Sequence, residues 1–202
     1  AEKFGLKIRS EDVTGLELSP KRKAVLTGGG PLETKAIILC CGANWKKLGI
    51  EGEDQLMGKG VSFCATCDGP FYRNQEVAVI GGGDTAVEEA IFLTRFVSKV
   101  HLVHRRDKLR AAKVLQERAM SHGKIEFIWD SVPVKILGEK GVEGIELKNV
   151  KTQSVSRKNV QGVFVFIGTL PNTHIVKGLI RLDENGFVVT DDNMQSSVQG
   201  VF

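Results

Sequence analysis

The sequence predicts an α/β fold, in which a buried parallel sheet forms the centre and helices cover it. Four apolar runs have the length and composition of strands buried on both faces: residues 76–80, 100–103, 125–129 and 162–168. After the first run the apolar spacing becomes helical, because Ala86, Val87 and Ala90 fall on one helix face. Strand, helix and strand in this order predict a βαβ unit.

The first third of the chain predicts a small antiparallel meander followed by a buried strand. Alternating apolar and polar residues indicate three strands, at residues 6–9, 13–18 and 23–27. Residues 36–42 form a continuous apolar run, which indicates a strand buried on both faces. Cys40 and Cys41 are expected to pack there as small core residues. Residues 44–60 are polar and irregular and are interpreted as a linker.

The second half of the chain adds a helix and another meander. Helical spacing returns at residues 110–122, where Val114, Leu115 and Met120 are available for packing. Residues 132–157 alternate again and predict a second set of short strands. These strands precede the last buried strand of the predicted parallel sheet.

Length and composition limit the class of protein. The chain has 202 residues, enough for one large domain or two small ones, and its net charge of +4 is spread along the sequence. We therefore expect no nucleic-acid partner. No apolar run approaches the roughly 20 residues that span a bilayer, and the first residues show no signal-peptide pattern, so we expect no membrane association. Four cysteines in a chain of this length need no disulfide scaffold, which favours the reducing cytoplasm.

A glycine-rich turn lies between the first strand and helix of the βαβ unit. Gly81 allows the tight turn, Gly83 lets the backbone approach a pyrophosphate, and Ala86 keeps the helix close to the sheet. Asp84 and Thr85 begin the helix, whose N-terminus offers free N–H groups to phosphates. The pattern predicts a Rossmann-like dinucleotide site. The alternative is a glycine-rich turn without a ligand.

Basic residues follow the second strand of the βαβ unit, where an NAD site usually carries an acidic residue. His104, Arg105, Arg106 and Arg110 stand there instead. Arginine side chains suit a 2′-phosphate, whereas a carboxylate would repel it. The sequence therefore favours NADPH over NADH. The alternative is a solvated basic turn.

Cys64 and Cys67 form a Cys-x-x-Cys motif, which brings two sulfurs within bonding reach when the segment turns or is helical. The motif indicates a centre that cycles between dithiol and disulfide. Half of a zinc site and inert structural cysteines are the alternatives. Asp68 follows directly, and it either relays protons during thiol exchange or belongs to an ordinary Asp-Gly turn.

Together these motifs resemble a low-molecular-weight, bacterial-type thioredoxin reductase. The resemblance rests on residues 64–69, 79–86 and 104–110 in this order and spacing, and residues 168–173 resemble a later segment of the family. It covers nearly the whole chain. It implies reduction of the thioredoxin disulfide by NADPH through FAD and the Cys64–Cys67 pair. It also implies a cytoplasmic homodimer as the parent enzyme.

The resemblance implies a division of the chain and a role for each site residue. Residues 44–166 would be the NADPH-binding domain with the redox dithiol, inserted between pieces of an FAD-binding domain at residues 1–43 and 167–202. Cys67 would face the flavin, Cys64 would attack the substrate, and Asp68 would donate the proton. The 2′-phosphate would lie on the three arginines with His104 beside them.

The sequence departs from the family at both ends. No Gly-x-Gly-x-x-Gly turn for the FAD pyrophosphate precedes residue 36, and the chain stops before the family's Ala-Gly-Asp segment. Residues 40–42 read Cys-Cys-Gly where the family usually has Ala-Thr-Gly. We therefore expect a sequence truncated at both ends that does not hold FAD tightly. An NADPH-binding redox module, or an inactive fragment without turnover, is the alternative function.

Overall fold

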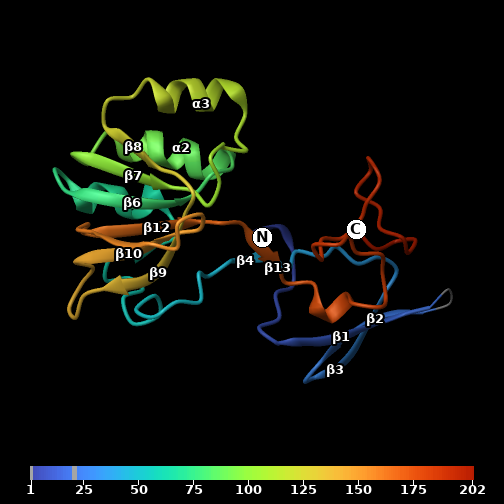
Figure 1. Cartoon of the computed structure of the whole chain (residues 1–202). Coiled ribbons are helices and arrows are strands. Elements are labelled where there is room, and N and C mark those ends of the chain that lie inside the picture. The colour runs from blue at the N-terminus through green and yellow to red at the C-terminus, as the bar shows by residue number, and fades with distance from the viewer. Residues whose placement is uncertain (1, 20–21) are drawn as a thin grey trace. The chain divides into compact units, whose positions relative to one another are not determined.

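A computed structural model describes residues 2–19 and 22–202 of the chain. Its contacts divide the chain into two compact units (Figure 1). Unit 1 combines the first 44 residues with residues 169–202, and unit 2 is the continuous segment 45–168. The assignment of these regions to FAD and NADPH binding stays a prediction.

The centre of unit 2 is a five-stranded sheet in the order β5-β12-β6-β7-β8. All neighbouring strands in it run parallel. Its strands are β5 (Val61–Ser62), β6 (Glu76–Gly81), β7 (Lys99–Val103), β8 (Ile125–Ile128) and β12 (Gly162–Phe166). The four runs at residues 76–80, 100–103, 125–129 and 162–168 therefore form strands of one parallel sheet, which confirms the α/β fold class.

Alternation along the strands produces two hydrophobic cores, one on each face of the sheet. On β6, Val77 and Val79 face the core beneath the helices, whereas Ala78 and Ile80 face the opposite core. All four of these side chains are buried. Burial on both faces explains why this strand reads as a continuous apolar run in the sequence.

Helices α2 (Asp84–Leu93) and α3 (Lys113–Met120) cover one face of the sheet (Figure 1). Helix α2 buries Ala86, Val87, Ala90 and Leu93, close to the predicted face. In α3 the expectation was wrong for two of three residues. Leu115 and Ala119, four positions apart, form the buried face. Val114 and Met120 lie about 100° around the helix from that face and are 61% and 56% exposed.

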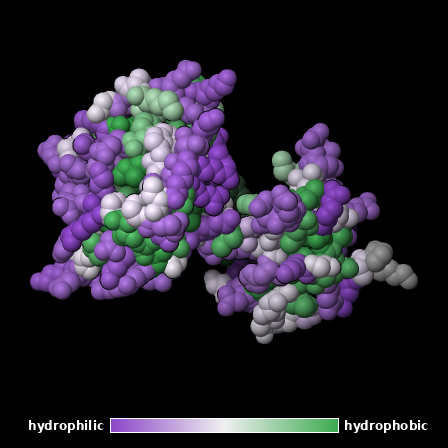
Figure 2. All heavy atoms as spheres, in the orientation of Figure 1, coloured by the Kyte–Doolittle hydropathy of each residue, from purple (hydrophilic) through white to green (hydrophobic). Residues whose placement is uncertain are grey.

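The other face of the parallel sheet is covered by an antiparallel sheet in the order β11-β10-β9 (Figure 1). Its strands are β9 (Ser131–Leu137), β10 (Gly144–Asn149) and β11 (Val155–Lys158). Helices, parallel sheet and antiparallel sheet make a three-layer arrangement. In Figure 2, hydrophilic residues cover most of the visible face of this unit.

The interpretation of residues 44–60 as a linker was wrong, because residues 45–60 belong to unit 2 and contribute to its core. Leu56 is fully buried in the core between the parallel and the antiparallel sheet. Glu53 is 2% exposed, and its carboxylate accepts hydrogen bonds from the backbone N–H groups of Leu48, at 2.8 Å, and Gly49, at 2.7 Å. A buried carboxylate that bonds two backbone donors fixes this segment although its sequence is irregular.

Unit 1 contains a three-stranded antiparallel sheet, β1 (Val13–Leu18), β2 (Lys23–Thr27) and β3 (Gly30–Thr34). The predicted strand at residues 6–9 is absent, because these residues have no strand partner and Leu6 and Ile8 are exposed. Two 3₁₀ turns, η1 (Glu2–Phe4) and η3 (His174–Val176), are the helical elements of the described part of this unit. Strand β4 (Ala43–Trp45) pairs with β13 (Thr169–Pro171).

The predicted buried strand at residues 36–42 is also wrong. The backbone of Ile37 and Leu39 bonds to residues 200–202, so the segment is paired along one side only. Ile37 is buried, but Ile38 is 75% exposed. Cys40 is exposed and Cys41 is half-buried, so neither is the core residue that the apolar run suggested. A run of apolar residues is buried on both faces only where layers cover both.

Candidate nucleotide pocket and dithiol

The turn after β6 has the geometry that only glycine permits at its first position. Gly81 has φ of +153°, where side chains are strained. A Cβ atom at Gly81 would collide with the carbonyl oxygen of Phe166 and lie 2.6 Å from the Cβ of Ala86. The missing side chain therefore lets α2 and β12 approach the same turn closely.

The next two glycines meet different surroundings. A Cβ at Gly82 would collide with the imidazole of His104, whereas the nearest atom to a Cβ at Gly83 is Nη2 of Arg110, at 3.9 Å. Gly83 is the N-cap of α2 and makes no side-chain cap. One face of the turn is thus closed by His104, and the face at Gly83 is open enough for a ligand to approach the backbone.

Backbone hydrogen bonds attach the basic segment after β7 to this glycine turn. The carbonyl of Gly82 accepts hydrogen bonds from the N–H of Arg110, at 2.7 Å, and of Ala111, at 3.2 Å. The carboxylate of Asp84 accepts another from the N–H of Ala112, at 2.7 Å. These bonds place the arginines beside the turn although more than 20 residues separate them in the sequence.

The turn and the basic segment form one wall of a pocket of about 470 Å³ that lies wholly within unit 2. This volume falls in the range of small-molecule sites. Among the predicted cofactor residues the pocket is lined by Gly81, His104, Arg105 and Arg110. Arg106 is exposed but does not line it.

His104 is a buried polar side chain that lines the pocket. It is 5% exposed, and within the described residues its Nε2 atom has no hydrogen-bond partner. Burial lowers the pKa of His104, and the charges of Arg110 and Arg105 lower it further. The imidazole is therefore neutral near pH 7, and the positive charge of the pocket comes from Arg105, Arg110 and Lys46. A buried ring nitrogen without a partner, an open glycine face and two arginines fit a phosphate-bearing nucleotide.

The cysteine pair lies at the start of α1 (Ala65–Asp68), where Cys64 is the N-cap. Cys64 and Cys67 form a disulfide with their Cα atoms 5.3 Å apart. Cys67 is exposed and Cys64 is half-buried. The N–H of Cys67 points at the sulfur of Cys64, at 3.2 Å, and Thr66 Oγ1 lies 3.3 Å from it. Such donors stabilise a thiolate after reduction.

The segment after the disulfide packs tightly against α2. A Cβ at Gly69 would lie 2.9 Å from Leu93, so glycine allows the close approach of the two helices. Asp68 and Tyr72 line a smaller pocket of about 250 Å³ with Phe71. Burial raises the pKa of Tyr72, and the charge of Asp68 adds to this rise. The predicted proton donor thus lies at the surface beside the disulfide.

Both features lie at the carboxyl edge of the parallel sheet. The disulfide follows β5 and the glycine turn follows β6, with β12 between these strands. Neither cysteine lines the nucleotide pocket. The structure therefore gathers four of the predicted cofactor residues around one pocket and places the dithiol two strands away.

The pocket also has walls that the sequence interpretation did not include. Phe166 and Ile167 come from the end of β12, and Ser131 comes from β9. Lys46 and Leu48 come from the segment that was interpreted as a linker. The end of a buried strand next to a glycine turn is a signal for the first two. No local pattern indicates Lys46.

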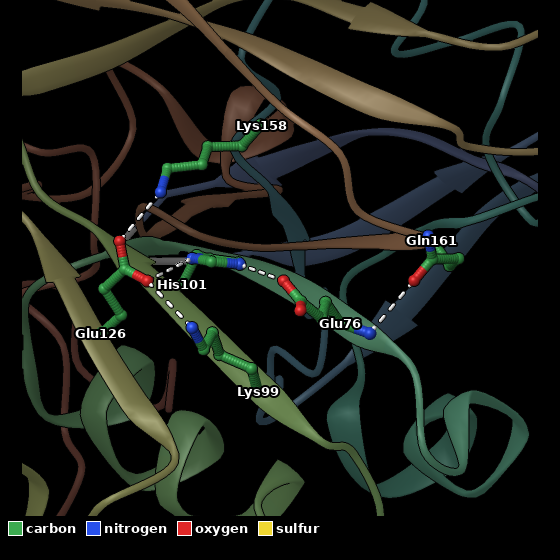
Figure 3. Close-up of polar contacts among 6 residues, drawn as sticks. All are labelled: Glu76, Lys99, His101, Glu126, Lys158 and Gln161. Atoms are coloured by element: carbon green, nitrogen blue, oxygen red, sulfur yellow. Dashed lines mark hydrogen bonds and ion pairs between the residues drawn. The ribbon is translucent and has the colours of Figure 1, made fainter.

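A second polar cluster lies toward the other end of the same strands (Figure 3). The imidazole of His101 lies between two carboxylates, with Nε2 2.8 Å from Glu76 and Nδ1 3.4 Å from Glu126. Lys158 and Lys99 pair with Glu126 at 2.8 and 3.4 Å. The cluster ties β6, β7, β8 and β11 together. Within the described residues, no group of three or more His, Cys, Asp or Glu side chains is arranged to hold a metal ion.

The fold and the two features of the edge match a known class of redox protein. Residues 3–202 match the model of the pyridine nucleotide-disulphide oxidoreductases, and the chain belongs to this family. More specifically, it groups with the thioredoxin reductases. The thioredoxin reductase of Streptomyces coelicolor is 46% identical over the whole chain, and that of Rickettsia conorii is 44% identical.

Solved structures agree with this placement. The thioredoxin reductase of Lactococcus lactis in its FR conformation matches the whole chain with a TM-score of 0.87 and 46% identity. The chain covers 67% of that structure, 63% of the Streptomyces protein and 67% of the Rickettsia protein. It thus spans about two thirds of the length of these relatives. No helix in the described residues has the length and apolar character needed to cross a membrane.

Membership of this family implies FAD and NADPH as cofactors. The pocket of unit 2 fits the nucleotide for the reasons given above. FAD does not fit unit 1 in the same way, because the described part of this unit has no α-helix and therefore no strand–turn–helix cradle for a pyrophosphate. The described residues form a pocket that fits a nucleotide and a disulfide near it, but no cradle that fits a flavin.

Proposed function

We propose that this chain belongs to an enzyme that reduces the disulfide of thioredoxin with NADPH, through FAD and the Cys64–Cys67 dithiol. One observation carries the proposal: a basic nucleotide pocket and a surface disulfide lie at the same edge of one parallel sheet. The names of the relatives support the choice of thioredoxin as the substrate. FAD, when bound, supplies the relay of two electrons between nicotinamide and disulfide.

In the overall reaction, NADPH and one proton reduce the Cys64–Cys67 disulfide to two thiols, and NADP⁺ is formed. Cys64, as thiolate, then attacks the disulfide of thioredoxin and forms a mixed disulfide, while the leaving sulfur takes a proton. Cys67 attacks the mixed disulfide, which releases the thioredoxin dithiol and restores the Cys64–Cys67 bond. We assign Asp68 as the proton donor at this surface. Cys67 is the sulfur that we assign to the side of the flavin.

The cofactor residues keep the roles that the sequence predicted. The pyrophosphate would be bound at the glycine turn and the start of α2, by Gly81, Gly83, Asp84, Thr85 and Ala86. The 2′-phosphate would be bound by Arg105, Arg106 and Arg110, with His104 beside them. Arg110 has the strongest structural support, since its backbone is bonded to the glycine turn and its side chain lines the pocket. Support for Arg106 is weaker, because it does not line the pocket.

The cellular setting and assembly are further parts of the proposal. We assign the parent enzyme to the cytoplasm, because a dithiol that must be reduced in each cycle suits a reducing compartment. We propose a homodimer for the parent enzyme on the family resemblance. Neither a nucleic acid nor a membrane is assigned as a partner.

A second candidate function is an NADPH-binding redox module without turnover. The observation that favours it is that the pocket and the disulfide both lie within unit 2. Without a flavin, a hydride from NADPH has no efficient route to a disulfide. The absorption spectrum of the purified chain separates the two functions. A flavin band stoichiometric with protein supports the enzyme, and a colourless protein that binds NADPH supports the module.

The nucleotide part of the proposal is tested by calorimetric titration of the purified chain. We expect NADPH to bind more tightly than NADH, and the Arg110→Gln variant to weaken NADPH binding about tenfold through loss of a charged hydrogen bond. NADH binding should change much less. Equal loss for both nucleotides, or none for either, would contradict the assignment of this end of the pocket to the 2′-phosphate.

A further inference from the structure

Lys46 lines the nucleotide pocket on the side opposite the arginines. Its backbone N–H donates to the carbonyl of Gly168, at 3.0 Å, just beyond the end of β12. Its Cδ atom lies 3.7 Å from the position of a Cβ on Gly168, so the side chain extends across this glycine. Arg105 lines the same pocket from the end of β7. Because β6 lies between β12 and β7, the glycine turn separates the two cations.

The segment around Lys46 is fixed on both sides. The ring of Trp45 stacks on Phe63 with centroids 6.5 Å apart. On the other side, the N–H groups of Leu48 and Gly49 bond to the buried carboxylate of Glu53. The position of Lys46 is therefore set by packing and hydrogen bonds, as a positioning residue requires.

The ammonium group of Lys46 makes no ion pair within the described residues, and the residue is half-buried. Its neighbour Lys47 differs in each respect. Lys47 is exposed, pairs with Asp54 at 2.7 Å and does not line the pocket. A half-buried cation without an anion, held at a pocket that suits phosphates, indicates a ligand that supplies the missing negative charge.

The direction of a dinucleotide in this pocket follows from its two ends. In a Rossmann-type site the residues after the second strand of the βαβ unit bind the adenosine ribose, and the pyrophosphate lies on the glycine turn. The second strand here is β7, which carries Arg105. The remaining half of the molecule must then extend over the end of β12, toward Lys46 and Ile167.

We propose that Lys46 binds the nicotinamide mononucleotide half of NADPH, with its ammonium on the phosphate of that half. Together with Arg105 and Arg110, it would neutralise the cofactor from both sides of the glycine turn. Lys46 is thus a positioning residue for the nicotinamide end, and this inference rests on the proposed NADPH function. Phe166 and Ile167 also line the pocket from the end of β12, and their apolar side chains offer no charge to this phosphate.

The test compares two ligands by calorimetric titration of the full chain. NADPH carries both halves, whereas adenosine 2′,5′-bisphosphate carries only the adenosine half. Lys46→Gln should weaken NADPH binding about five- to tenfold, the effect of losing one partly solvated charged hydrogen bond. It should leave the binding of the bisphosphate within about twofold. Lys47→Gln is the matched control, and it should change neither affinity.

The outcomes separate a wrong assignment of Lys46 from a failure of the proposed NADPH function. If wild type binds NADPH and Arg110→Gln weakens both ligands while Lys46→Gln weakens neither, the assignment of Lys46 is wrong and the pocket is not. If Lys46→Gln weakens both ligands equally, Lys46 acts on the adenosine half or on the whole field, and the assignment is also wrong. If wild type binds neither ligand, the proposed NADPH function fails. Unchanged circular dichroism and thermal midpoint of Lys46→Gln would exclude misfolding.

Discussion

Alanine at the two adjacent glycines of the turn should separate the folding of the pocket from its use. At Gly82 an added methyl group would collide with the ring of His104. At Gly83 the nearest atom is Arg110 Nη2, at 3.9 Å, which is an ordinary contact. Gly83 has φ of −90° and ψ of −178°, a backbone conformation that alanine adopts freely. The same chemical change thus meets a buried ring in one variant and open space in the other.

The magnitudes follow from these surroundings. Gly82→Ala overpacks a site whose neighbour, His104, is only 5% exposed, so we expect a loss of about 1–3 kcal/mol in the free energy of unfolding. Gly83→Ala loses about 0.5–1 kcal/mol as a weaker N-cap and regains about 0.4–1 kcal/mol from the lower entropy of the unfolded chain. Its stability should therefore stay within about 0.5 kcal/mol of wild type.

The affinity for NADPH should distinguish the two variants in the opposite way to their stability. The methyl group at Gly83 occupies the face where a pyrophosphate would approach the backbone, so we expect NADPH affinity to fall at least about tenfold in Gly83→Ala. Urea unfolding followed by circular dichroism measures the stability, and calorimetry measures the affinity. A Gly83→Ala protein that binds NADPH as tightly as wild type would refute the assignment of this face. A Gly82→Ala protein of unchanged stability would refute the packing argument.

Two further predictions concern packing and charge in unit 2. Gly69→Ala brings a methyl group to 2.9 Å from the fully buried Leu93, so the thermal midpoint should fall by a few degrees, equivalent to about 1 kcal/mol; no change would show that α1 yields without cost. The hydrogen bond from Lys158 lowers the pKa of Glu126, so this carboxylate stabilises the fold above its unfolded pKa, and the gain is lost as the pH falls through the folded value. Because the side chain of Glu126 is 39% exposed, Glu126→Gln should lower the free energy of unfolding by no more than about 1 kcal/mol at pH 7. In urea titrations, the difference in unfolding free energy between the variant and wild type should shrink below about pH 4.5. A difference that persists in acid would show that the ion pair with Lys158 is not its cause.

Features that depend on a few neighbouring residues could be predicted from the sequence. The glycine turn is such a feature, because the backbone conformation of Gly81 and its contact with Ala86, five positions further on, both require glycine, and the distant Phe166 only adds a further contact. The parallel strands were predictable because burial on both faces leaves a continuous apolar run. The Cys64–Cys67 pair was predictable because a short helix brings positions three apart together.

Features that depend on distant residues could not be predicted. Glu53 and Leu56 are buried because other segments cover them, and nothing nearby in the sequence indicates this cover. The apolar run that contains Ile38 and Cys40 shows the opposite case, since its strand-like pattern is paired on one side only. Lys46 reaches the pocket through a bond to Gly168, a residue that lies 122 positions away (168 − 46).

The backbone hydrogen bond between Lys46 and Gly168 also holds the two ends of unit 2 together. It joins residues that stand almost at the first and last positions of that unit, so the two ends of the unit meet. A segment whose ends meet can be spliced into a surface loop of another protein without stretching its host. Unit 2 therefore has the geometry of an insertable domain, and its pocket and its disulfide could be transferred together into a surface loop of another protein.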